Sequence, residues 1–137
     1  FGLCGVMILA AALAIVVALQ GGQQFDLVCV GTTTSGGDYR ELTTKPSSSR
    51  LRLDLREGRW CVNACTHHSE FARVSSVELL LEDAATAGGL EMRRVVDRTT
   101  GAYSVSIRTN IAGIRGWTRS SEQCELATYT PIPTARF

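Results

Sequence analysis

The sequence RLRLDLREGRWCVNAC, from Arg50 to Cys65, contains the clearest structural signal in the chain. Its first half alternates polar residues with leucines, which places Leu51, Leu53 and Leu55 on one face of an extended strand. The dipeptide EG that follows is a turn signal, because glycine tolerates the positive φ that tight hairpins need. A return strand then begins with RWC. The stretch therefore predicts a β-hairpin whose tryptophan packs near a local pair of cysteines.

Further strands are expected on both sides of this hairpin. Residues 25–31 (FDLVCVG) have the β-branched and aromatic composition of a strand, residues 90–107 predict a second hairpin with a turn at residues 98–101, and residues 117–129 predict a last strand or pair. Residues 74–82 (VSSVELLLE) fit a strand or a helix, and the neighbouring strands favour a strand.

Two segments predict polar loops instead. Residues 32–49 are mostly Thr, Ser, Gly and Pro, with a weak strand signal at residues 39–43, and residues 83–89 (DAATAGG) form a shorter loop. The fold class expected is all-β: an antiparallel meander of about seven or eight short strands, closed as a small barrel or folded as a sandwich. Closure removes exposed edges, so the barrel is favoured.

The beginning of the sequence is strongly apolar. Residues 1–19 (FGLCGVMILAAALAIVVAL) contain no charge, which fits a secretory signal or, at roughly 20 apolar residues, a membrane anchor. The alanine-rich composition and the polar GGQQ that follows favour a cleaved signal. We therefore expect a signal peptide or anchor in residues 1–20 and a single disulfide-stabilised β domain in residues 24–137. Either reading predicts export to the periplasm or cell envelope.

The charge balance excludes some partners. The 14 basic and 13 acidic residues give a net charge of +1 and are interleaved along the chain, so the sequence shows no basic stripe for a nucleic-acid backbone. We expect no nucleic-acid partner. A membrane contact is expected only through residues 1–20, if that segment is retained.

Cysteine usage points to disulfides. After Cys4 in the leader, the chain has Cys29, Cys61, Cys65 and Cys124, and an even number in a small exported domain is typical of two bridges. Four cysteines allow three connectivities. Proximity favours Cys61–Cys65, which leaves Cys29 and Cys124 to join the two ends of the domain.

The only cluster that suggests chemistry is Cys61-x3-Cys65-x-His67-His68. Sulfur and imidazole could bind zinc, but four ligands within eight residues can hardly surround one tetrahedral ion, and an oxidising compartment favours a disulfide. No serine-hydrolase elbow or phosphate-binding glycine loop is present. We therefore expect no enzyme activity, no metal and no cofactor.

The larger aromatic residues suggest a ligand pocket as an alternative function. They would line a pocket inside a small barrel or, as is more usual, fill its core; they are Trp60, Trp117, Tyr39, Tyr103 and Tyr129.

The chain resembles a group of small exported bacterial proteins with no assigned activity. The resemblance is carried by the apolar leader, by the motifs FDLVCVGT, RLRLDLREGRWC and VDRTTGAY, and by a late cysteine. The resemblance implies export and a β-rich fold. The size and paired cysteines are also similar to periplasmic β-barrel inhibitors of c-type lysozyme, in architecture alone. We expect a non-catalytic envelope or periplasmic module that binds a protein or envelope partner; the alternatives are a small apolar-ligand carrier and a lysozyme-inhibitor-like protein.

Overall fold

In the computed structural model, residues 23–133 are described, and the expected leader at residues 1–20 lies outside them. The described residues form nine strands of one antiparallel sheet: β1 (Gln24–Gly37), β2 (Arg40–Asp54), β3 (Arg59–Val62), β4 (Ser69–Glu70), β5 (Arg73–Val74), β6 (Glu78–Ala85), β7 (Leu90–Asp97), β8 (Ala102–Ile111) and β9 (Ile114–Ala127). Their order across the sheet is β4-β3-β2-β1-β9-β8-β7-β6-β5. Within residues 23–133, no helix is long and apolar enough to span a bilayer.

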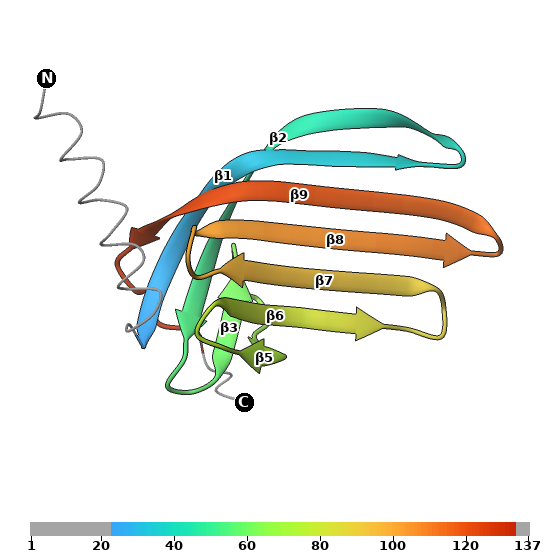
Figure 1. Ribbon diagram of the computed structural model, residues 1–137. Helices are drawn as coiled ribbons and strands as arrows, with labels where there is room; N and C mark the ends of the chain where they lie inside the picture. The colour runs from blue at the N-terminus through green and yellow to red at the C-terminus, as the bar shows by residue number, and fades with distance from the viewer. Residues whose placement is uncertain (1–22, 134–137) are drawn as a thin grey trace, which may run out of the picture.

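The sheet curls into a half-barrel that nearly closes at one end only (Figure 1). At this closed end, β4 and β5 follow each other in the chain and form the two opposite edges of the sheet. Glu70 pairs with Arg59 of β3, and Arg73 pairs with Leu80 of β6. The all-β prediction is confirmed, but the expected closed barrel or two-layer sandwich is replaced by a single curled sheet.

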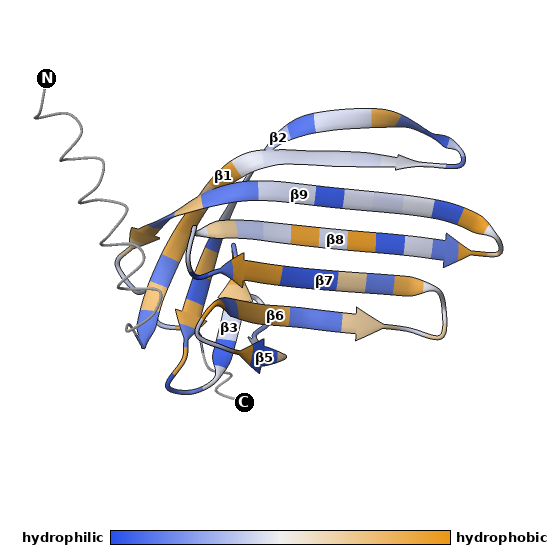
Figure 2. Cartoon of the chain, viewed as in Figure 1, coloured by the Kyte–Doolittle hydropathy of each residue, from blue (hydrophilic) through white to orange (hydrophobic). Residues whose placement is uncertain are grey.

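The hydrophobic core occupies the closed end and defines the inner face of the sheet. Figure 2 shows the apolar segments of β1, β2, β6 and β7 gathered there. In β1, Phe25, Leu27 and Cys29 lie two residues apart and so point to the same side of the strand, into the interior of the curl. The buried set is Phe25, Leu27, Cys29, Leu51, Leu53, Trp60, Leu79, Leu81, Val96, Tyr103, Val105 and Cys124.

The predicted central hairpin is confirmed. β2 and β3 pair from Leu51↔Val62 to Asp54↔Arg59, and Gly58 in the turn has a φ of 69°. Trp60, however, lies in the main core, whereas Cys61 and Cys65 form a separate cluster with Ile132. The expected packing of this tryptophan near those sulfurs is wrong, because neighbouring residues of a strand point to opposite faces.

The other half of the sheet extends beyond the core as a single layer. We call residues 32–48, 82–94 and 104–121 the extension. The prediction of a polar loop at residues 32–49 is wrong. β1 and β2 remain paired through this region, from Thr32↔Pro46 to Thr34↔Thr44. Threonine favours extended structure, and a strand with solvent on both faces needs no apolar alternation.

The second expected loop is also shorter than its composition suggested. β6 continues to Ala85, which pairs with Glu91 of β7. The segment at residues 74–82 is a strand over Glu78–Ala85, as its neighbours favoured, and the hairpin of β7 and β8 is confirmed.

Candidate functional site

Two disulfides join the four cysteines of the described residues. Cys61 bonds to Cys65, with an S–S distance of 2.06 Å, and Cys29 bonds to Cys124, with an S–S distance of 2.01 Å. Cys29 and Cys124 face each other across β1 and β9, so this bridge is set by strand register. Their sulfur atoms are not available as thiolate ligands.

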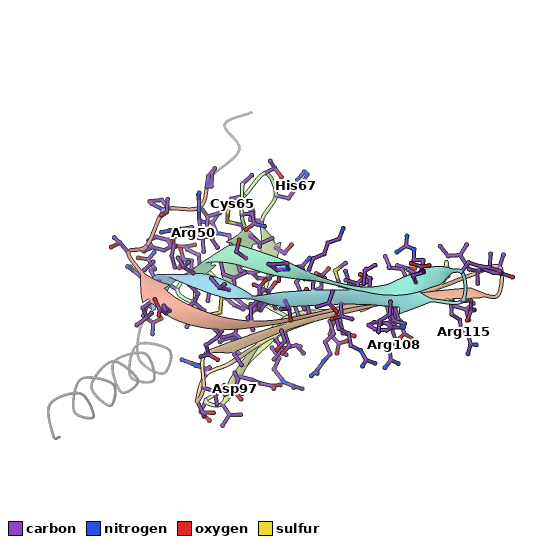
Figure 3. The ribbon with its side chains drawn as sticks, turned by 90° about the horizontal axis from the view of Figure 1, so that it is seen from above. Arg50, Cys65, His67, Asp97, Arg108 and Arg115 are labelled. Carbon is purple, nitrogen blue, oxygen red and sulfur yellow. A yellow bond between two sulfur atoms is a disulfide. The ribbon has the colours of Figure 1, made fainter. Side chains whose placement is uncertain are left out.

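His67 lies in the exposed loop after Cys65, at the closed end and away from the extension (Figure 3). His68 is exposed in the same loop. No three His, Cys, Asp or Glu side chains within residues 23–133 are arranged to hold a metal ion.

The aromatic residues do not line one common pocket. Trp60 and Tyr103 fill the core. Tyr129 donates a hydrogen bond to the Asp54 carboxylate (Oη–Oδ2 3.2 Å). The remaining two, Tyr39 and Trp117, lie on the extension, far from the core.

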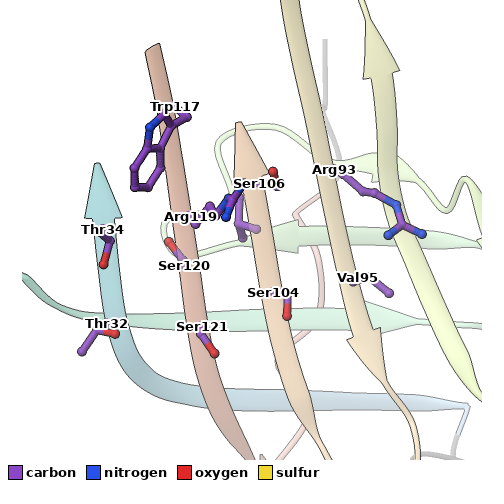
Figure 4. Close-up of a pocket in the computed structure, with 11 residues that line it drawn as sticks. Thr32, Thr34, Arg93, Val95, Ser104, Ser106, Trp117, Arg119, Ser120 and Ser121 are labelled. Carbon is purple, nitrogen blue, oxygen red and sulfur yellow. The ribbon is translucent and has the colours of Figure 1, made fainter. Parts of the chain in front are cut away.

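Trp117 lines a shallow groove of about 460 Å³ on the outer face of the extension, opposite the face that carries the core (Figure 4). Hydroxyl groups, two arginines and the side chains of Val95 and Val105 form the rest of its wall. The other lining residues include Thr32, Thr34, Arg93, Ser104, Ser106, Arg119 and Ser121.

Strand register gathers arginines around this groove. Ser106 of β8 pairs with Arg93 on one side and with Arg119 on the other, so the three residues form one row across the sheet. In the next row, Arg108 pairs with Trp117. We call Arg93, Arg108, Arg119 and Trp117 the arginine face.

The arginine face carries an excess of positive charge. The sequence from residue 98 to residue 121 contains four arginines and no acidic residue. Within the described part of the chain, no ion pair neutralises Arg93, Arg108 or Arg119. Asp83 is the cross-strand neighbour of Arg93, and Glu91 is that of Arg108. Both acids moderate the local positive potential without forming ion pairs.

Trp117 is held flat by a glycine on the next strand. A Cβ on Gly36 would lie 2.9 Å from Cζ2 of the indole, which means that the ring rests against the β1 backbone. The Arg119 guanidinium carbon lies 5.4 Å from the ring centroid, within cation–π range. Sequence reasoning missed this arrangement, although a glycine within a Ser/Thr-rich segment was its available signal.

A second polar cluster lies on the inner face, where the core ends. Arg94 donates hydrogen bonds to the Tyr103 hydroxyl (2.9 Å) and to Glu82 (3.1 Å). Burial raises the pKa of Tyr103, and the nearby guanidinium partly opposes that rise. Ser47 donates to Oε2 of Glu122 at 2.7 Å. These bonds satisfy polar groups at the margin of the core, whose last members on β8 are Tyr103 and Val105.

The fold and this surface define a class: a disulfide-bonded all-β half-barrel with an uncovered sheet extension. The two disulfides indicate an oxidising, extracytoplasmic environment. The chain matches no protein-family model, and no similar curated protein or solved structure was found. The geometry of the extension is therefore the best indication of function.

Proposed function

We propose that this protein is an exported, non-catalytic binding module of the periplasm or cell envelope, and that its arginine face binds an acidic polysaccharide. The observation that carries this proposal is the row Arg93–Ser106–Arg119 beside the flat indole of Trp117. It combines cationic donors, hydroxyl groups and an aromatic surface in one open groove.

The spacing of the arginines suits an extended acidic polymer. Arg93 and Arg119 lie two strands apart, which corresponds to about 10 Å between backbones. Two acidic groups of one chain could therefore bind both guanidinium groups together, each through paired donors. A sugar ring would stack on Trp117, and the Ser and Thr hydroxyls would bond to sugar hydroxyls.

The alternative functions have less support in the geometry. A carrier of a small apolar ligand needs an interior cavity, and the closed end is filled by side chains such as Leu27, Leu53 and Tyr103. The resemblances to lysozyme inhibitors and to small exported proteins indicate no ligand-binding residues.

The experiment compares binding to polygalacturonate, a polymer of acidic sugars, with binding to uncharged dextran. We expect polygalacturonate to bind with an affinity that falls as salt rises, because the ion pairs are exposed, and dextran not to bind. Arg93→Ser and Arg119→Ser should each weaken binding about tenfold. The matched control is Arg56→Ser, which removes the same charge from the exposed turn after β2.

Three outcomes would contradict the proposal. An equal loss in Arg56→Ser would indicate attraction to overall charge rather than to the arginine face. Equal binding of dextran would exclude recognition of acidic groups. Tighter binding of a single-stranded DNA oligonucleotide would favour base stacking on Trp117 instead.

A further inference from the structure

One row of residues crosses the extension through the arginine face. Directly paired residues of neighbouring strands lie on the same face of a sheet. We call the residues of this row the outer row. In the order of the strands from β6 to β2, they are Asp83, Arg93, Ser106, Arg119, Thr34 and Thr44. Those from Arg93 to Thr34 line the groove beside Trp117 (Figure 4).

Charge alternates along the outer row. Arg93 and Arg119 carry the positive charges, and Ser106 between them is neutral. Thr34, on the far side of Arg119, is neutral as well. On the far side of Arg93 lies Asp83, which is exposed and forms no ion pair within residues 23–133. The row therefore attracts an acidic group at two positions and repels one at the position of Asp83.

The spacing of the outer row matches the spacing of sugars in a chain. Adjacent strands lie about 4.8 Å apart, which is close to the length of one sugar ring in an extended polysaccharide. A polymer that crosses the strands along this row therefore places about one sugar on each strand. Arg93 and Arg119, about 10 Å apart, then face every second sugar, and Ser106 faces the sugar between them.

Trp117 adds an aromatic surface at one of the neutral positions. It precedes Arg119 on β9 by two residues, so both side chains lie on the outer face. Its ring rests against Gly36 of β1, which lies two residues from Thr34 on the same strand. The indole therefore flanks the position at Thr34. An uncharged sugar stacks better there than an acidic one, because the negative face of the ring repels a carboxylate.

We propose that the arginine face recognises an acidic polysaccharide in which charged sugars alternate with uncharged ones. This inference rests on the proposed function and narrows its ligand class. Carboxylates of every second sugar pair with Arg93 and Arg119, while the uncharged sugars lie over Ser106 and beside Trp117. A polymer that is charged on every sugar brings surplus carboxylates to Ser106 and towards the like charge of Asp83.

The test compares two oligomers with the same number of sugars. In hyaluronate oligomers, glucuronate alternates with uncharged N-acetylglucosamine, whereas galacturonate oligomers are charged on every sugar. Titration calorimetry at one fixed ionic strength measures both affinities, since salt screens exposed charges. We expect the hyaluronate oligomer to bind the wild-type protein about fivefold more tightly, although it carries half the charge.

A cation at the neutral position should reverse this preference. Ser106→Lys places an ammonium group where the galacturonate oligomer has its surplus carboxylate, so this oligomer should bind at least as tightly as hyaluronate. The matched control is Ser48→Lys, which adds the same charge at an exposed position of β2 outside the outer row. It should leave the ratio of the two affinities unchanged. Thr34→Lys makes the change at the second neutral position and replaces Ser106→Lys if thermal unfolding shows that this variant is not folded.

The outcomes separate this inference from the proposed function. If neither oligomer binds, both are wrong. If Arg93→Ser and Arg119→Ser weaken both oligomers but the wild type does not prefer hyaluronate, the arginine face binds acidic sugars without reading their spacing, and this inference alone is overturned. An equal change of the affinity ratio in Ser48→Lys and Ser106→Lys would also overturn it, because added charge would then act from any position.

Discussion

Trp60 donates a hydrogen bond from Nε1 to the backbone carbonyl of Leu81, 3.1 Å away, and so connects β3 to β6 across the interior of the half-barrel. The same N–H also lies 3.3 Å from the carbonyl of Glu70. These strands are near opposite edges of the sheet and do not pair directly. One indole side chain therefore joins the two edges at the closed end, where the core lies.

This relationship predicts the effect of Trp60→Phe. The smaller ring still fills most of the site, but the buried carbonyl of Leu81 loses its partner. We expect the free energy of unfolding to fall by about 1–3 kcal/mol, as measured by urea denaturation. Trp117→Phe, on the uncovered extension, is the control and should cost less. Equal losses in both variants would mean that the hydrogen bond contributes little to closure.

The two disulfides should differ in their effect on stability. Cys29–Cys124 closes a separation of 95 residues and Cys61–Cys65 a separation of 4. Chain entropy predicts a loss of about 4–5 kcal/mol for the double alanine variant of the long bridge and about 2 kcal/mol for that of the short one. Chemical denaturation of both variants measures this. A larger loss for the Cys61/Cys65 variant would show that local shape matters more than chain closure.

The packing of Trp117 against Gly36 predicts the effect of adding one methyl group at that glycine. In Gly36→Ala, the added Cβ would lie 2.9 Å from the indole and should push the ring off the β1 backbone. We expect affinity for polygalacturonate to fall about tenfold. Titration with the polymer measures the affinity, and thermal unfolding verifies the fold.

Two other glycines serve as comparisons for this variant. Gly88→Ala has ample space in the turn after β6 and should change neither binding nor stability. Gly31→Ala would press against the backbone carbonyl of Ser121 and should disturb the β1–β9 pairing itself. Unchanged binding in Gly36→Ala would argue against stacking on the indole.

Acid should weaken the turn between β7 and β8. Asp97 accepts hydrogen bonds from the hydroxyl and the N–H of Thr99 and from the N–H of Thr100, and the Thr99 side chain is the main cause of its lowered pKa. Because the folded pKa lies below the unfolded value, this contribution to stability is present above about pH 4 and is lost as the pH falls through the folded pKa.

Thermal unfolding of the wild type and of Asp97→Asn between about pH 5 and pH 2 tests this expectation. The neutral amide should remove part of the acid sensitivity and lower stability near neutral pH. Thr99→Val, which removes the hydroxyl donor, should have a smaller effect in the same direction. An identical acid response in the wild type and Asp97→Asn would exclude Asp97 as a source of the acid sensitivity.

Some features could be predicted because they depend on residues close together in the sequence. The hairpin of β2 and β3 follows from the leucine alternation and from Gly58, and Cys61–Cys65 lies within one short turn. By contrast, the composition of residues 32–49 predicts a loop, because Ser and Thr give no apolar alternation when both faces of a strand meet solvent. Here cross-strand pairing overrides composition.

The candidate site could not be predicted in the same way. Arg93, Arg108 and Arg119 are separated by 15 and 11 residues, and nothing in that spacing indicates that they lie near one another. Their proximity depends on which residue of β8 faces which residue of β7 and β9. A shift of one residue in the register of one strand would turn all of its side chains to the other face, and so would remove its arginine from this surface.

The sequence by itself therefore determined the strand segments that carry the core, the all-β class and the cysteines available for pairing, because these follow from local alternation, turn residues and composition. Only the tertiary structure decided that the sheet curls around one end, leaves the other end uncovered, and gathers arginines and Trp117 on one face. Those features result from strand register and from where the apolar residues suffice to form a core, and both depend on contacts between distant parts of the chain.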